Sequence, residues 1–135
     1  MNTIELQQTL PEVFADSNGI TSDIWHKQVA FQRGQLCLIE AASGTGKSSL
    51  CNFIYGVRTD YQGIICFDDE NVRTFPLSRW VNIRKKNLSM LFQDLRLFSE
   101  LTAYENVQMK NSLTGCQTKK QIKQWFEALG IADKW

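Results

Sequence analysis

The chain has 135 residues, of which 43% are hydrophobic, and its 15 basic and 14 acidic side chains give a net charge of +1. This length allows one domain at most, over residues 1–135, and the apolar content excludes a disordered chain. The balanced charge and the lack of a long apolar run exclude strong attraction to nucleic acid and a membrane-spanning helix. We therefore predict no nucleic-acid partner and no direct membrane insertion.

Strand and helix signals alternate along the chain. In chain order they predict strands at 3–10, 24–31 and 35–40, a helix at 47–55, a strand at 63–67, a helix at 76–86, a strand at 88–92, and helices at 102–110 and 118–129. The second strand places Trp25, Val29 and Phe31 on one face. The run QLCLIE at 35–40 is typical of a strand buried on both faces of a parallel sheet. We expect an α/β fold with a partly parallel sheet.

Local signals fix several boundaries. Gly56 stands where a glycine commonly ends a helix, after the predicted helix at 47–55. Thr102 and Thr118 are each followed three residues later by Glu or Gln, which is the pattern of a capping box. The four cysteines have no C-x-x-C spacing, which favours free thiols in a reducing compartment.

The segment EAASGTGKSSL, at 40–50, joins a predicted strand to a predicted helix. Gly44 and Gly46 let the backbone take conformations closed to other residues and approach a ligand closely, and the N–H groups at the helix start would form an anion-binding nest. Lys47 would reach the β- and γ-phosphates of a nucleotide, and the Ser48 hydroxyl would ligate Mg²⁺. The predicted loop comprises Ala41, Ser43, Gly44, Thr45, Gly46, Lys47, Ser48 and Ser49. A flexible surface loop with a lysine is the alternative.

Ala41 stands where the commonest form of this motif has glycine. Its methyl group costs affinity only if the position requires a positive φ. We therefore expect weakened or unchanged nucleotide affinity.

The acidic run Asp68-Asp69-Glu70 follows the apolar strand at 63–67 and resembles a second Mg²⁺ contact. The connection from the preceding helix is short, which suits an antiparallel hairpin better than a crossover to a parallel strand. We predict a solvated hairpin turn, with a metal site as the alternative.

Residues 88–107, LSMLFQDLRLFSELTAYENV, resemble the glutamine-loop region of ABC transporter ATP-binding subunits, especially the bacterial group that handles lipoproteins, macrolides or cell division. The likeness runs from about Ile4 to the end of the chain. It implies a P-loop NTPase-like fold with an N-terminal antiparallel β subdomain, and the cofactors ATP and Mg²⁺. It also implies that Phe14 stacks on adenine and that Gln93 contacts Mg²⁺ and the attacking water.

The same resemblance implies a transmembrane permease as partner and a cytoplasmic location at the inner face of the membrane. Trp80, Phe92, Leu95, Leu97 and Phe98 would form part of the permease-facing surface, with core packing as the alternative for Trp80 and Phe92.

The family's signature loop, catalytic glutamate and switch histidine have no match in these 135 residues, and His26 falls in an early predicted strand. We expect an N-terminal part of the domain with an incomplete core, which binds ATP without turnover. Unpaired strands favour a homodimer or other self-association.

Two other classes stay open. A GTPase or small kinase would share the loop, but the sequence has no Asn-Lys-x-Asp stretch and no arginine-rich lid after Gln93. A non-catalytic nucleotide-binding interaction module is the third possibility.

Overall fold

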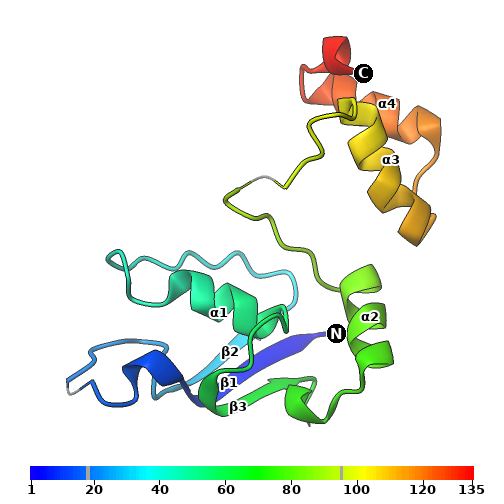
Figure 1. The fold of residues 1–135 in the computed structure, drawn as a ribbon. Helices are drawn as coiled ribbons and strands as arrows, with labels where there is room; N and C mark the ends of the chain where they lie inside the picture. The colour runs from blue at the N-terminus through cyan, green and yellow to red at the C-terminus, as the bar shows by residue number, and fades with distance from the viewer. Residues whose placement is uncertain (18, 95) are drawn as a thin grey trace. The chain divides into compact units, whose positions relative to one another are not determined.

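The computed structural model describes residues 1–17, 19–94 and 96–135, which form two compact units, Met1–Met90 and Leu91–Trp135 (Figure 1). The first unit contains β1 (Thr3–Pro11), η1 (Glu12–Phe14), β2 (Gln28–Gln32), α1 (Lys47–Ile54), β3 (Tyr61–Phe67), β4 (Glu70–Asn71), η2 (Val72–Thr74) and α2 (Leu77–Lys86). The second contains α3 (Ala103–Thr114), α4 (Lys119–Ala128) and η3 (Ala132–Lys134). The predicted mixture of helices and strands is confirmed.

The first unit is built on a sheet in the order β2-β1-β3-β4. Leu6 of β1 lies opposite Val29 of β2 on one side and Ile65 of β3 on the other. All the pairs formed by the described residues are antiparallel. The expected antiparallel β subdomain is therefore present, whereas the expected parallel pairing is not seen in this part of the chain.

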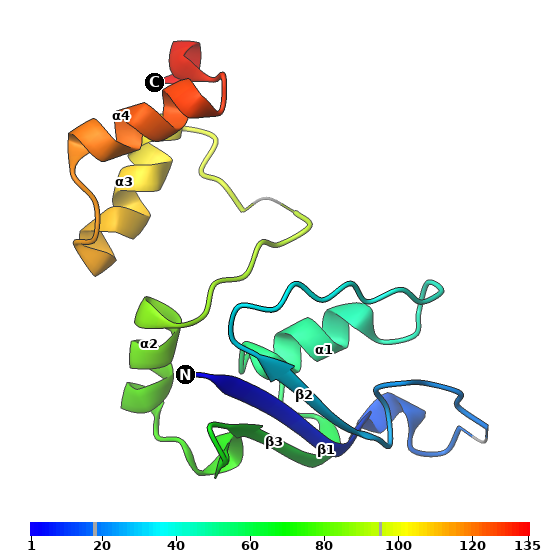
Figure 2. The ribbon, with the colours of Figure 1, turned by 180° about the vertical axis from the view of Figure 1, so that it is seen from behind.

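Helix α1 covers one face of this sheet (Figures 1 and 2). Leu50 and Phe53 of α1 pack in one apolar cluster with Leu6 of β1 and Ile65 of β3, and all four are at most 2% exposed. Burying a side chain of this size contributes about 1.5–3 kcal/mol. A helix of 8 residues is unstable alone in water, so this packing stabilises α1.

A bulge in β1 explains one glycine of the sheet. The register of β1 and β3 shifts between Gln7 and Leu10, where Gln8 has a φ of 50°. Opposite the bulge, Gly63 has a φ of 80°, and a Cβ placed there would lie 2.4 Å from the Gln8 carbonyl oxygen. Only glycine meets both conditions without a shift of the backbone.

The acidic run forms the predicted hairpin turn between β3 and β4. Asp68 and Asp69 have φ values of 47° and 68°, and Phe67 pairs with Glu70. The Asp68 carboxylate accepts the backbone N–H groups of Asn2 and Thr3 at 2.6 and 2.9 Å. These hydrogen bonds, together with the nearby N-terminal amine, lower the pKa of Asp68.

Two predicted strands are not strands in the structure. Residues 35–40 and 88–92 lie outside the sheet, and Leu36 and Leu38 have exposed fractions of 102% and 83%. A strand buried on both faces needs a neighbouring strand at each edge. The described residues offer these segments no such neighbours, so Leu36, Leu38 and Leu91 are exposed, whereas Ile39 and Leu88 are partly buried against the core of the first unit.

The second unit consists mainly of two capped helices. Thr102 and Thr118 both form the predicted capping boxes, with Glu105 and Gln121 respectively. Ile122 and Phe126 of α4 are buried. None of the described helices is long and apolar enough to cross a membrane.

All four cysteines are free, in agreement with the prediction from their spacing. Cys66 lies buried in β3, whereas Cys37, Cys51 and Cys116 are exposed. Burial is the main cause that raises the pKa of the Cys66 thiol.

Candidate functional site

The loop before α1 has the backbone that the sequence predicts. Gly44 and Gly46 have φ values of 81° and 96°, and Gly46 is the N-cap of α1. The Leu50 N–H donates to the Gly46 carbonyl at 2.9 Å and begins the helix. Ala41 is not among the residues with a positive φ, so its backbone is not strained by its methyl group.

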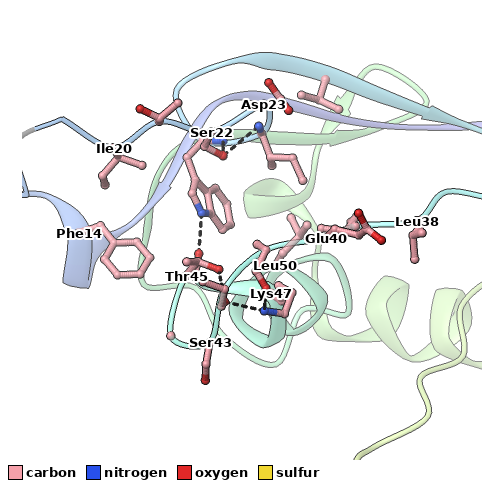
Figure 3. Close-up of a pocket in the computed structure, with 18 of the residues that line it drawn as sticks. Phe14, Ile20, Ser22, Asp23, Leu38, Glu40, Ser43, Thr45, Lys47 and Leu50 are labelled. Carbon is pink, nitrogen blue, oxygen red and sulfur yellow. Dashed lines mark hydrogen bonds between the residues drawn. The ribbon is translucent and has the colours of Figure 1, made fainter.

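The Lys47 side chain folds back over this loop (Figure 3). Its Nζ donates to the carbonyl oxygens of Ala41 and Ala42 at 2.5 and 2.7 Å. The Thr45 hydroxyl also donates to the Ala42 carbonyl, at 2.8 Å. In these two hydrogen bonds the exposed ammonium meets neutral carbonyl oxygens. Its hydrogen bonds to phosphate oxygens would be stronger, because donor and acceptor would carry opposite charges. The loop and the Lys47 ammonium therefore fit the phosphates of a nucleoside triphosphate.

A cavity of about 930 Å³ lies beside the loop in the first unit. Figure 3 shows Phe14 and Ile20 on one side of the cavity, Leu38 on the other, and Thr45 and Lys47 between them. This volume lies within the range of small-molecule sites. The predicted site residues that line it are Phe14, Ala41, Ser43, Gly44, Thr45 and Lys47.

Four predicted residues, Gly46, Ser48, Ser49 and Gln93, are not among the residues that line the cavity. Ser48 and Ser49 occupy the first turn of α1, and the Ser49 hydroxyl accepts a hydrogen bond from Arg58 at 3.1 Å. Gln93 belongs to the second unit, where it is exposed in a turn. Their roles toward nucleotide and Mg²⁺ stay predictions.

Trp25 is part of the site, although the sequence placed it in a strand. It lies in a turn before β2 whose backbone is held by the Ser22 hydroxyl, which accepts the Trp25 N–H at 3.0 Å. Its indole Nε1–H donates to the Thr45 carbonyl at 3.0 Å, and the side chain is 6% exposed. His26, predicted in the same strand, instead has a φ of 57° in this turn. The serine three residues before Trp25 was the available signal for a turn.

Phe14 and Trp25 enclose the glycine at the helix start. A Cβ placed on Gly46 would lie 3.1 Å from the Phe14 ring and 3.0 Å from the Trp25 ring. The site therefore combines a glycine-containing loop, a helix N-terminus, a lysine over the loop and an aromatic wall. A glycine-containing loop, a helix N-terminus and a lysine are features that phosphate loops combine.

The particular family follows from comparison with known proteins. The sequence profile of the ABC transporter family matches residues 26–135. The chain therefore belongs to the ABC transporter family.

Several relatives carry ATP-binding names. The chain is 30% identical to the macrolide export ATP-binding/permease protein MacB of Aggregatibacter actinomycetemcomitans, over 100% of this chain and 21% of the relative. It is 30% identical to the ABC transporter ATP-binding protein YtrE of Bacillus subtilis, over 73% of this chain and 44% of the relative. It is 27% identical to the lipoprotein-releasing system ATP-binding protein LolD of Shewanella denitrificans, over 91% and 54% respectively. The chain thus spans about half or less of the length of these relatives.

Proposed function

We propose that this chain binds ATP·Mg²⁺ as part of the ATP-binding subunit of an ABC transporter. The observation that carries the proposal is the Lys47 ammonium, which lies over the loop at the N-terminus of α1 and within reach of the Ala41 and Ala42 carbonyls. Membership of the ABC transporter family supports it.

Each predicted residue then has a distinct role. The backbone N–H groups from Gly44 to Ser49 and the Lys47 ammonium hold the phosphates, while the Ser48 hydroxyl ligates Mg²⁺. Bound Mg²⁺ neutralises phosphate charge. Phe14 lines the same cavity as Lys47 and stacks on the adenine ring.

Binding by these 135 residues proceeds without turnover. Gln93 would orient water, but no residue of this sequence matches the catalytic glutamate or switch histidine of the family. Sustained phosphate release by the purified chain above that of Lys47→Ala would contradict this part of the proposal.

A membrane permease is the proposed partner, and it would hold the chain at the cytoplasmic face of the membrane. Leu97 and Phe98 are 66% and 54% exposed and are available for such a surface. Trp80 instead packs edge-on against Phe67 at 5.8 Å, which supports its core alternative. Leu95 lies outside the described residues. Co-purification with a permease, lost when Leu97 and Phe98 are changed to Ser, tests this surface.

Self-association of the chain is supported by the exposed Leu36 and Leu38 in the extended segment before the loop. Sedimentation velocity tests it, since a monomer mass that does not change with concentration would exclude it.

Calorimetric titration with ATP·Mg²⁺ tests the binding site. The Lys47→Ala variant should lose affinity at least about tenfold, because a charge-assisted contact contributes about 1.5–3 kcal/mol. The control is Lys86→Ala, which removes an exposed lysine at the end of α2 and should bind as the wild type does. Equal affinity of Lys47→Ala and the wild type would remove the site assignment.

A further inference from the structure

We infer that Trp25 is a positioning residue that sets the peptide plane between Thr45 and Gly46 for phosphate binding. The inference rests on the proposed function of the loop. It goes beyond the family match, which begins at residue 26, after Trp25.

The first step is the hydrogen bond itself. The indole has one donor, and Trp25 directs it to the Thr45 carbonyl at 3.0 Å while the ring is 6% exposed. In a trans peptide the C=O and the following N–H point in opposite directions. The bond that holds the Thr45 carbonyl toward the indole therefore turns the Gly46 N–H away from it.

The second step is the packing on Gly46. Trp25 and Phe14 approach the site of an absent Cβ within 3.0 and 3.1 Å, whereas a Cβ on Gly44 would meet nothing within 4 Å. One glycine of the loop is thus walled by rings and the other is open. Gly46, the glycine beside the two rings, carries the N–H whose direction the Thr45–Gly46 peptide plane sets. Phosphate would therefore reach the loop from the side away from the indole.

The third step is the rigidity of the Trp25 backbone. The Ser22 hydroxyl accepts the N–H groups of Ile24 and Trp25 at 3.1 and 3.0 Å. On the other side of Trp25, the His26 N–H donates to the Thr9 carbonyl of β1 at 3.1 Å. These bonds anchor the indole donor to the sheet, so it can orient the loop before a ligand arrives.

The test is Trp25→Phe, which keeps a ring near Gly46 and removes the donor. Its affinity for ATP·Mg²⁺ and for inorganic triphosphate·Mg²⁺ should fall by about three- to tenfold, the effect of one neutral hydrogen bond. Both ligands should weaken equally, because the bond acts on the phosphate loop. By contrast, Phe14→Ala should weaken ATP and spare triphosphate. The matched control, Trp125→Phe, changes a half-exposed indole on α4 and should alter neither affinity.

A second measurement uses the wild-type chain, so it applies even if Trp25→Phe does not fold. The four indole N–H signals of the wild-type chain can be assigned by elimination with Trp80, Trp125 and Trp135 each changed to Phe. The Trp25 signal should shift on addition of triphosphate·Mg²⁺, and its exchange with solvent should slow, because ligand and hydrogen bond favour the same loop conformation. A merely structural tryptophan would lower the melting temperature of the variant and leave this signal unmoved.

The outcomes separate the two proposals. If Lys47→Ala binds triphosphate as the wild type does, the proposed function fails. If Lys47→Ala loses binding while Trp25→Phe keeps wild-type affinity, or the Trp25 signal does not respond to ligand, the positioning role of Trp25 is overturned and the binding site stands.

Discussion

Arg84 donates from its Nη2 to the carbonyl oxygen of Gly56 at 2.8 Å, and from its Nε to the Tyr55 carbonyl at 3.1 Å. Helix α1 is therefore followed directly by backbone carbonyls that bind a guanidinium from α2. Carbonyls at the end of a helix lack helical partners and carry partial negative charge, so a cation there stabilises the helix.

Arg84→Ala should lower the free energy of unfolding by about 1–2 kcal/mol, since it removes charge-assisted hydrogen bonds from a partly exposed group. Arg84→Lys should restore only part of this, because an ammonium cannot reproduce the planar fork. The measurement is urea unfolding followed by circular dichroism. Lys85→Ala, at the exposed neighbouring position, serves as control and should change stability by less than about 0.5 kcal/mol. An equal loss in both variants would contradict the capping role.

Gly63→Ala should be far more destabilising than Gly34→Ala. The two glycines have φ values of 80° and 84°, so both variants carry a similar cost of about 1–2 kcal/mol for the left-handed backbone. At Gly34 the new Cβ meets nothing within 4 Å, whereas at Gly63 it lies 2.4 Å from the Gln8 carbonyl oxygen. The additional steric cost should bring the loss for Gly63→Ala to about 3 kcal/mol or more.

Melting temperatures of the two glycine variants, measured under one set of conditions, check this difference. Similar temperatures for both would mean that the bulge relaxes around the methyl group, and the close packing of Gly63 on Gln8 would then not be required for the fold.

Asp68→Asn should lower stability at neutral pH and have no effect in strong acid. Asparagine accepts the φ of 47° at this position, so the change removes mainly the charge. Hydrogen bonds from Asn2 and Thr3 lower the pKa of Asp68 in the folded protein. The ionised carboxylate therefore stabilises the fold above its unfolded pKa of about 4, and this contribution is lost as the pH falls through the lower folded pKa.

The Asp68 side chain is 42% exposed, so screening by solvent keeps the expected loss below about 1 kcal/mol. Urea midpoints at pH 7 and pH 2.5 measure it, with Asp69→Asn as the control in the same turn. A difference between wild type and Asp68→Asn that persists unchanged in acid would show that the charge is not its cause.

Local signals predicted much of the secondary structure. Gly56, Thr102 and Thr118 act on residues within one helical turn, and the structure has a helix boundary within two residues of each. Gly44 and Gly46, in the loop before α1, have positive φ values for the same reason. These features can be predicted from the sequence, because the groups that interact to form them are neighbours in the chain.

Contacts between distant segments could not be predicted in this way. The apolar run at 35–40 indicates what such a strand would bury, but it does not contain the neighbouring strands that would bury it. Trp25 shares a period-two pattern with Val29 and Phe31, and that pattern gives no sign of the bond to Thr45, which lies 20 residues further along the chain. The part of the site formed by the indole is therefore visible only in the fold.

Three of the four thiols, those of Cys37, Cys51 and Cys116, are exposed and can be labelled with dyes. Cys51 on α1 and Cys116 after α3 are exposed, whereas Cys66 is shielded and its raised pKa leaves little reactive thiolate. Changing Cys37 to Ser would leave one labelling position in each compact unit. A donor and an acceptor fluorophore at these positions would report by energy transfer whether added ATP·Mg²⁺ changes the distance between the two labels.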